Sequence, residues 1–171
     1  MPASPDDGPP LGRWSPSGAV GDLVTVHLLA TPVRVWHRAT EHHDELMREM
    51  ALLSLTARHP GQHLPARLAE LADLLGGRST RATGRPDHTL ARALSDRLDR
   101  LDLAFEVIRA TGTAARELGA AMTELETYCR RGDLLTLPQP EVQRDFNHWY
   151  VEQFVTQTAG GPPTPWPGPW T

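Results

Sequence analysis

The sequence contains no lysine, and it contains a single cysteine, Cys129. One cysteine excludes an intramolecular disulfide framework and any zinc or redox site built on paired cysteines. The absence of lysine excludes the phosphate-binding loop of many nucleotide hydrolases, because that glycine-rich loop ends in lysine followed by serine or threonine. All 17 basic residues are therefore arginine. This bias favours GC-rich codons and indicates a high-GC bacterial genome.

The chain also lacks a strong charge of either sign and a long apolar run. Its 17 arginines face 21 acidic residues, and the net charge of −4 is not typical of a dedicated nucleic-acid-binding protein. The longest mostly apolar run, 23–35, is interrupted by His27 and Arg34 and is too short to span a membrane. The first residues have no apolar segment like that of a secretion signal. We therefore expect a cytoplasmic protein that binds neither nucleic acid nor membrane.

The motifs of several common enzyme classes are missing as well. The sequence has no GxGxxG, no GxSxG, no HExxH and no ExxH. These absences remove the standard interpretations as a dinucleotide-binding enzyme, a serine hydrolase, a metalloprotease or a di-iron bundle. The sequence therefore assigns no catalytic residue, no cofactor and no metal.

Helical periodicity is the strongest positive signal in the chain. Apolar residues recur at spacings of three and four, as at Leu46, Met50 and Leu53, with charged residues on the opposite face. Thr31 is expected to cap the first of these helices through its hydroxyl group. The predicted helices cover about 32–57, 65–75, 87–98, 113–131 and 140–158.

Two short segments have the character of strands instead. Residues 23–29 are rich in β-branched side chains, and residues 101–108 alternate apolar with acidic ones. A lone strand is unstable, so we expect the two to pair. The predicted fold is mainly α, with about five helices around one core and a short two-stranded β element. The remaining edge of that element could pair with a second chain and give a homodimer.

The ends of the chain differ in composition from its middle. Residues 1–20 contain five prolines and three glycines and are expected to form a disordered arm. Residues 21–159 are expected to form a single helical domain. Residues 160–171 contain five prolines and two tryptophans, which predicts an extended, polyproline-like tail.

Histidine is the one residue type that suggests a small ligand. His37 and Glu41 are one helical turn apart and could both contact an ion, but they lie on a charged face and no second histidine-rich helix completes a tetrahedral site. His43 lies in the apolar register of the same helix. It could be a switch, a ligand contact, an acid–base group in an internal pocket, or a hydrogen-bonded core histidine. The alternative function is therefore a small-molecule- or metal-binding helical bundle.

Six of the ten aromatic residues lie in the last part of the chain. They are Phe146, Trp149, Tyr150, Phe154, Trp166 and Trp170. Tryptophan and tyrosine are preferred anchors of protein interfaces, so we predict that the last helix and the tail bind another protein. The alternative is that the helix packs into its own core with the tail folded over it.

Three segments of the sequence carry a family resemblance. They are HHDELMRE (42–49), YCRRGDLLTL (128–137), and FNHWYVEQFV together with the later PPTPW (146–166). In these segments the chain resembles a group of actinobacterial proteins of similar length that occur beside anti-sigma-factor kinases and STAS-domain antagonists of partner-switching systems. The resemblance covers most of residues 22–166 and agrees with the GC-rich codon bias. It implies a non-enzymatic regulatory protein-interaction domain and carries over no catalytic residues.

Overall fold

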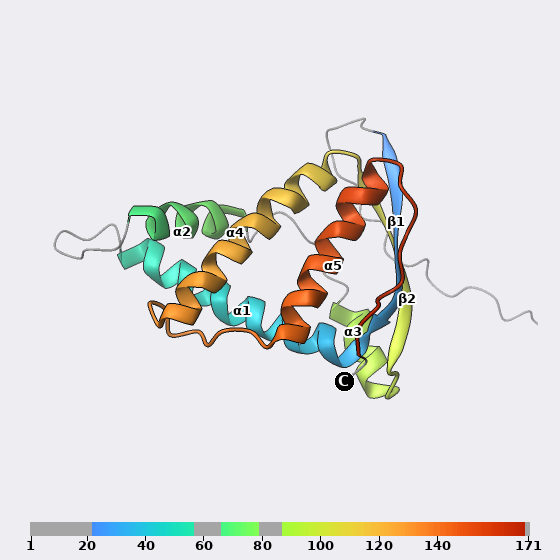
Figure 1. The fold of residues 1–171 in the computed structure, drawn as a ribbon, viewed down its shortest axis with the longest axis horizontal. Helices are drawn as coiled ribbons and strands as arrows, with labels where there is room; N and C mark the ends of the chain where they lie inside the picture. The colour runs from blue at the N-terminus through green and yellow to red at the C-terminus, as the bar shows by residue number, and fades with distance from the viewer. Residues whose placement is uncertain (1–21, 57–65, 79–86, 170–171) are drawn as a thin grey trace, which may run out of the picture.

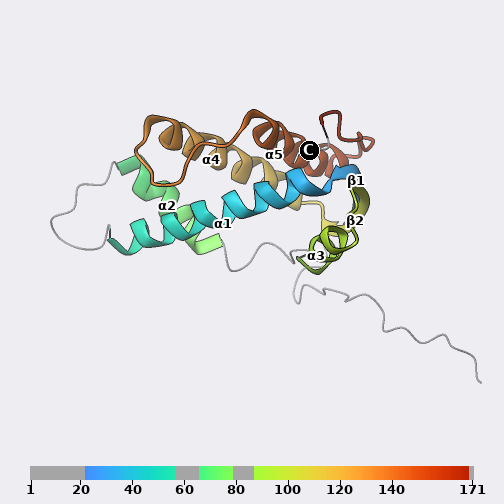
Figure 2. The ribbon, with the colours of Figure 1, turned by 90° about the horizontal axis from the view of Figure 1, so that it is seen from below.

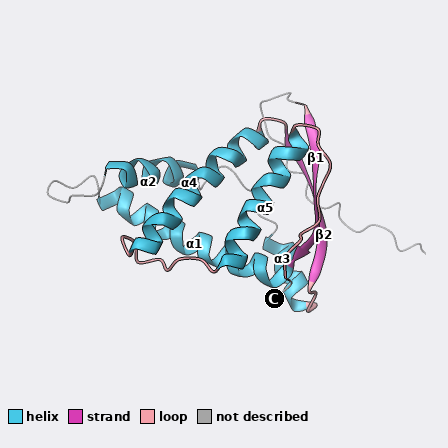
Figure 3. Cartoon of the chain, viewed as in Figure 1, coloured by secondary structure: helices cyan, strands magenta, loops and turns pink. Residues whose placement is uncertain are grey.

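The computed structural model describes residues 22–56, 66–78 and 87–169. In chain order the elements are β1 (Leu23–Pro32), α1 (Val33–Thr56), α2 (Ala66–Arg78), α3 (Asp87–Ser95), β2 (Arg100–Ile108), α4 (Thr111–Arg131) and α5 (Glu141–Thr158). The helices pack together, and the two strands lie at one end of the molecule (Figures 1 and 3). The predicted mainly α fold with a short two-stranded β element is confirmed. The expected arm, 1–20, lies outside the described residues.

β1 and β2 form the two-stranded antiparallel sheet that the sequence predicts. Leu23 lies opposite Ile108, and Val26 lies opposite Phe105. Val26 and Leu28 are fully buried, whereas alternate residues of β2 are exposed. One face of the sheet therefore packs against the helices, and the other faces outward.

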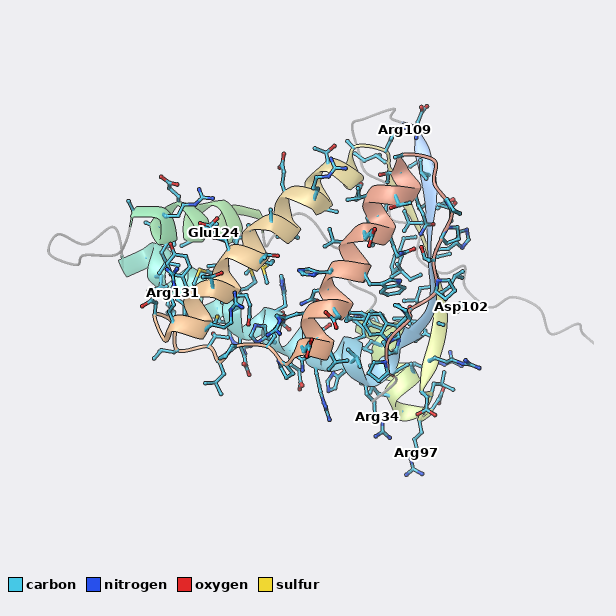
Figure 4. All side chains as sticks on the ribbon, in the orientation of Figure 1. Arg34, Arg97, Asp102, Arg109, Glu124 and Arg131 are labelled. Carbon is cyan, nitrogen blue, oxygen red and sulfur yellow. The ribbon has the colours of Figure 1, made fainter. Side chains whose placement is uncertain are left out.

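A bulge interrupts the pairing near the end of β1. The register shifts between Leu28 and Thr31, where Ala30 has a φ of 54° in the left-handed region. The backbone N–H of Ala30 donates to Oδ1 of Asp102 at 2.6 Å, so an aspartate of β2 replaces the missing strand partner. Figure 4 labels Asp102 on β2, at the outer side of the sheet. The bulge bends β1 toward the start of α1.

The predicted capping role of Thr31 is wrong. Its hydroxyl donates back to the carbonyl of Leu28 at 3.3 Å, and strand pairing continues to Pro32. The N–H of Val33, the first residue of α1, donates to the carbonyl of Asp99 at 3.0 Å. The carbonyl of Asp99, directly before β2, therefore satisfies the first of the N–H groups that lack a partner within α1.

The apolar core consists of two clusters that α1 connects. The first lies between the sheet, α3, α5 and the beginning of α1. The second lies between the rest of α1, α2, α4 and the segment that follows α4. With 24 residues, α1 is about 36 Å long and extends through both clusters (Figure 2).

α4 and α5 approach each other closely at glycine. A methyl group at Gly112 would collide with the hydroxyl of Thr158, and one at Gly119 would press against the side chain of Val151. Small residues on one helix allow the backbones of two helices to come close. The first part of α4 and the later part of α5 therefore lie in close contact.

Candidate partner-binding site

The aromatic residues of α5 lie mostly in the first core cluster. Phe146, Trp149 and Phe154 are buried, and so is Trp166 of the tail, with 4% of its surface exposed. The ring of Trp166 meets Phe146 and Trp149 edge-on, with centroid distances of 5.8 and 5.7 Å. Aromatic pairs at such angles contribute about 1 kcal/mol each beyond the area that they bury.

Hydrogen bonds hold the tail over these rings. The indole N–H of Trp149 donates to the carbonyl of Thr164 at 2.9 Å, and Gln153 Oε1 accepts the N–H of Thr164 at 2.9 Å. The backbone N–H of Trp166 donates to the carbonyl of Leu29 on β1 at 3.1 Å. The tail therefore lies along β1 and closes the aromatic cluster (Figure 1).

In the fold, most residues of the predicted aromatic interface are buried. The four buried side chains, Phe146, Trp149, Phe154 and Trp166, follow the alternative in which the helix packs into its own core and the tail folds over it. The reason is that the tail itself supplies the tryptophan that covers the helix. Tyr150 is half-buried, and Trp170 lies outside the described residues.

The histidines of α1 lie on different sides of the helix. His37 Nε2 is 3.5 Å from Glu41 Oε1, and both side chains are exposed. His43 and its neighbour His42 are both half-buried. The side chain of His42 is 11% exposed, and its Nε2 lies 4.0 Å from Glu126 Oε2 on α4. In the described part of the chain, no three histidine, cysteine or acidic side chains gather as metal ligands would.

Burial controls the protonation of the His42–Glu126 contact. Burial lowers the pKa of His42, and the nearby charge of Glu45 offsets this only in part. Burial raises the pKa of Glu126, while the N–H of Gln139 and the positive charge of Arg144 oppose the rise. The fold therefore favours a neutral imidazole, and the contact is weaker than a full ion pair.

Glu126 also holds the end of the loop that joins α4 to α5. Its Oε1 accepts the backbone N–H of Gln139 at 3.0 Å. The side chain of Gln139 accepts a hydrogen bond from Asn147 Nδ2 at 3.0 Å, and its carbonyl accepts one from Arg144 at 3.0 Å. Gln139 Nε2 is buried and has no partner among the described residues. Three hydrogen bonds therefore meet at Gln139, one to Glu126 of α4 and two from Arg144 and Asn147 of α5.

Glu49 of α1 fixes the middle of the same loop. Its Oε1 accepts the N–H of Leu135 at 2.6 Å, and its Oε2 accepts the N–H and the hydroxyl of Thr136 at 2.8 and 2.6 Å. Leu134 and Thr136 are buried, whereas Leu135 and Leu137 are 92% and 78% exposed. Two leucines therefore project outward from a backbone that carboxylates of two helices hold in place.

This loop begins at a well-defined helix end. Gly132 has a φ of 75°, and its N–H donates to the carbonyl of Cys129 at 3.1 Å. Arg131, at the last residue of α4, lies where the loop starts (Figure 4). The sequence signal for the exposed site is the run DLLTL (133–137), which carries three leucines without a helical period. The carboxylate that fixes it, on α1, is 86 residues away in sequence and could not be assigned from the pattern.

A shallow depression of about 460 Å³ lies elsewhere, at the bulge end of the sheet. It is lined by Leu29, Ala30, Arg100, Leu101, Asp102 and Pro165. His43 and the His42–Glu126 contact do not line it. The depression therefore provides no internal pocket for the histidine chemistry that the sequence left open.

No family model, curated protein or solved structure matches the chain. Among the helices that the structure describes, none combines the length and the apolar character needed to cross a membrane. The features that remain for a functional interpretation are the fixed loop with its exposed leucines and the open edge of the sheet.

Proposed function

We propose that the protein is a non-enzymatic regulatory domain that binds another protein through the loop 132–140. The observation that carries this proposal is the exposure of Leu135 and Leu137 on a backbone held by Glu49 and Glu126. Burying a leucine side chain contributes about 1.5–3 kcal/mol. A loop that is already ordered loses little conformational freedom on binding, so more of that energy remains as affinity.

The geometry of the loop indicates how the partner recognises it. The N–H groups of Leu135 and Thr136 are already bonded to Glu49, so they are not available for addition of a strand. The partner therefore recognises the side chains. Leu135 and Leu137 are two residues apart and exposed on the same segment, which suits an apolar groove on the surface of a folded protein.

The sequence resemblance suggests the setting. It supports a cytoplasmic partner from an anti-sigma-factor or related partner-switching pathway. One resembling segment, 128–137, contains both exposed leucines. The proposed surface therefore lies within the part of the chain on which the resemblance rests.

Affinity capture from the source organism tests this function. Wild type is compared with the double variant Leu135→Ser/Leu137→Ser and with the control Leu23→Ser, which changes a leucine that is 64% exposed on β1. The expected result is a protein captured by wild type and the control but lost with the double variant, while all three unfold at similar temperatures. Equal capture of the same proteins by all three would contradict the proposal.

A further inference from the structure

The outer edge of β1 is closed by the chain itself. The carboxamide of Gln157 on α5 accepts the N–H of His27 at 2.8 Å and donates to the carbonyl of His27 at 2.8 Å. Two residues further along β1, the carbonyl of Leu29 accepts the N–H of Trp166. A side-chain amide and the tail therefore take the place of a neighbouring strand on this side of the sheet.

These contacts also define which backbone groups of β2 point outward. The N–H and the carbonyl of His27 are bonded to Gln157, so they point away from β2, and the opposite residue Ala104 must direct its own groups away from β1. The direction of the backbone N–H and carbonyl groups alternates from residue to residue along a strand, so those of Asp102 and Glu106 also point away from β1. Among the described residues, no backbone hydrogen bond is made to the outward groups of these three residues. Within the part of the chain that the structure describes, β2 therefore has an open edge.

The apolar side of β2 is covered less well than that of β1. Leu101, Leu103 and Phe105 are half-buried, although they belong to the same inner face as the fully buried Val26 and Leu28. A further strand beside β2 would cover the remaining apolar surface of this row. It would also satisfy the open backbone groups.

We propose that this strand is β2 of a second copy of the chain, paired antiparallel about a two-fold axis to give a four-stranded sheet. Charge selects the register. With the axis at Leu103, Asp102 faces Ala104 of the partner subunit, and Arg100 faces Glu106 of the partner subunit. The two-fold axis repeats each of these pairs, so the interface contains two Arg100–Glu106 pairs. Cross-strand pairs of opposite charge stabilise a sheet, and like charges directly opposite destabilise it.

The neighbouring registers are disfavoured on the same grounds. Sliding one strand by two residues in one direction moves the axis to Ala104 and places Asp102 opposite Glu106 of the partner subunit, twice. Sliding it the other way places Asp102 opposite Asp102 of the partner subunit. Of these three registers, only the one about Leu103 therefore pairs charges of opposite sign without opposing two acids.

This interface is separate from the proposed partner-binding loop. α5 lies between the sheet and the loop 132–140 (Figures 1 and 2). Dimerisation through β2 would therefore leave both copies of the loop accessible and make the molecule bivalent. The dimer does not depend on the proposed function, and each can fail while the other stands.

Light scattering and sedimentation of the full chain over a range of concentrations test the dimer. Wild type is expected to associate reversibly to twice the monomer mass. The variant Glu106→Arg should weaken association about 10-fold, because both cross-strand pairs become repulsive. The double variant Arg100→Glu/Glu106→Arg should restore it, because the charges are exchanged but remain complementary.

A second variant makes the test independent of charge. The N–H of Ala104 points away from β1, so Ala104→Pro removes a hydrogen bond of the dimer without removing one of the β1–β2 ladder. It should be monomeric and should keep the far-ultraviolet circular dichroism of wild type. A wild type that is monomeric at all concentrations would overturn the inference. An E106R variant that associates as tightly as wild type or more tightly would overturn it too.

Discussion

Carboxylate and carboxamide side chains complete the backbone hydrogen bonding at three places where regular structure ends. Glu49 accepts hydrogen bonds from Leu135 and Thr136, and Glu126 accepts one from Gln139. Gln157 is hydrogen-bonded to both backbone groups of His27. Each contact joins segments that are distant in sequence, except for the shorter link from Glu126 to Gln139. A buried N–H without an acceptor costs about 1–3 kcal/mol, so these few side chains have a large influence on the loops that they hold.

Replacing Glu49 by alanine should loosen the loop without disturbing the helices. Three hydrogen bonds to Leu135 and Thr136 would be lost, and we expect a loss of about 2 kcal/mol in the free energy of unfolding. Hydrogen exchange at the amides of Leu135 and Thr136 should become faster in the variant. Glu41→Ala, on the exposed face of α1, is the control and should change neither quantity. Unchanged exchange at both amides in E49A would show that Glu49 does not fix the loop.

His42 should make stability depend on pH. Because the pKa of His42 in the fold lies below its ordinary value of 6.5, the fold favours the neutral imidazole. Its contribution is therefore present above pH 6.5 and is lost as the pH falls from 6.5 through the lower pKa of the folded state. Between a pH of about 7.5 and about 5.5, wild type should lose more stability to urea than His42→Gln.

Glu126 acts in the opposite direction and must be separated from His42. Its pKa is raised from 4.5 by burial, so the protonated form is favoured in the fold and its contribution is lost as the pH rises through the folded value. The difference between wild type and His42→Gln cancels this effect, because both proteins keep Glu126. Equal losses of stability in the two proteins would contradict the assigned burial of His42.

At the scale of elements, hydrophobic spacing was sufficient to find the helices and strands. The alternation of Leu101, Leu103 and Phe105 with acidic residues marks β2, and spacings of three and four mark the longer helices. Spacing placed the start of α1 within one residue of Val33, but the expected cap at Thr31 was wrong because strand pairing replaces it. It also did not single out His42, because the contact of His42 with Glu126 depends on a second helix that helical period alone does not place.

The close contact between α4 and α5 should not tolerate a methyl group. Gly112→Ala would raise the helix propensity of α4, but the added carbon collides with the hydroxyl of Thr158. Overpacking of this kind costs about 1–3 kcal/mol, so we expect a net loss of stability in thermal unfolding. The double variant Gly112→Ala/Thr158→Ala should recover part of that loss. A G112A variant as stable as wild type would mean that the helices can move apart without cost.

At the scale of the whole molecule, α1 joins an end that contains the sheet to an end that contains the loop. The position of the tail was the main feature that the sequence could not establish. A proline-rich segment has no period that indicates a buried side, and Trp166 is buried only because α5 and β1 together offer it a place. The proposed role of the loop 132–140 could not be predicted from the sequence for a similar reason, because the support of the loop comes from Glu49 on a distant helix.

The most direct test of the central claim is photo-cross-linking in living cells with a photo-reactive amino acid at position 137. If the loop 132–140 is the partner-binding surface, position 137 gives a cross-linked species of discrete mass containing a second protein, and Leu135→Ser in the same chain abolishes it. The same amino acid at position 23, on β1, should not give that species. The claim is contradicted if position 137 gives no such species, or gives it equally with Leu135→Ser.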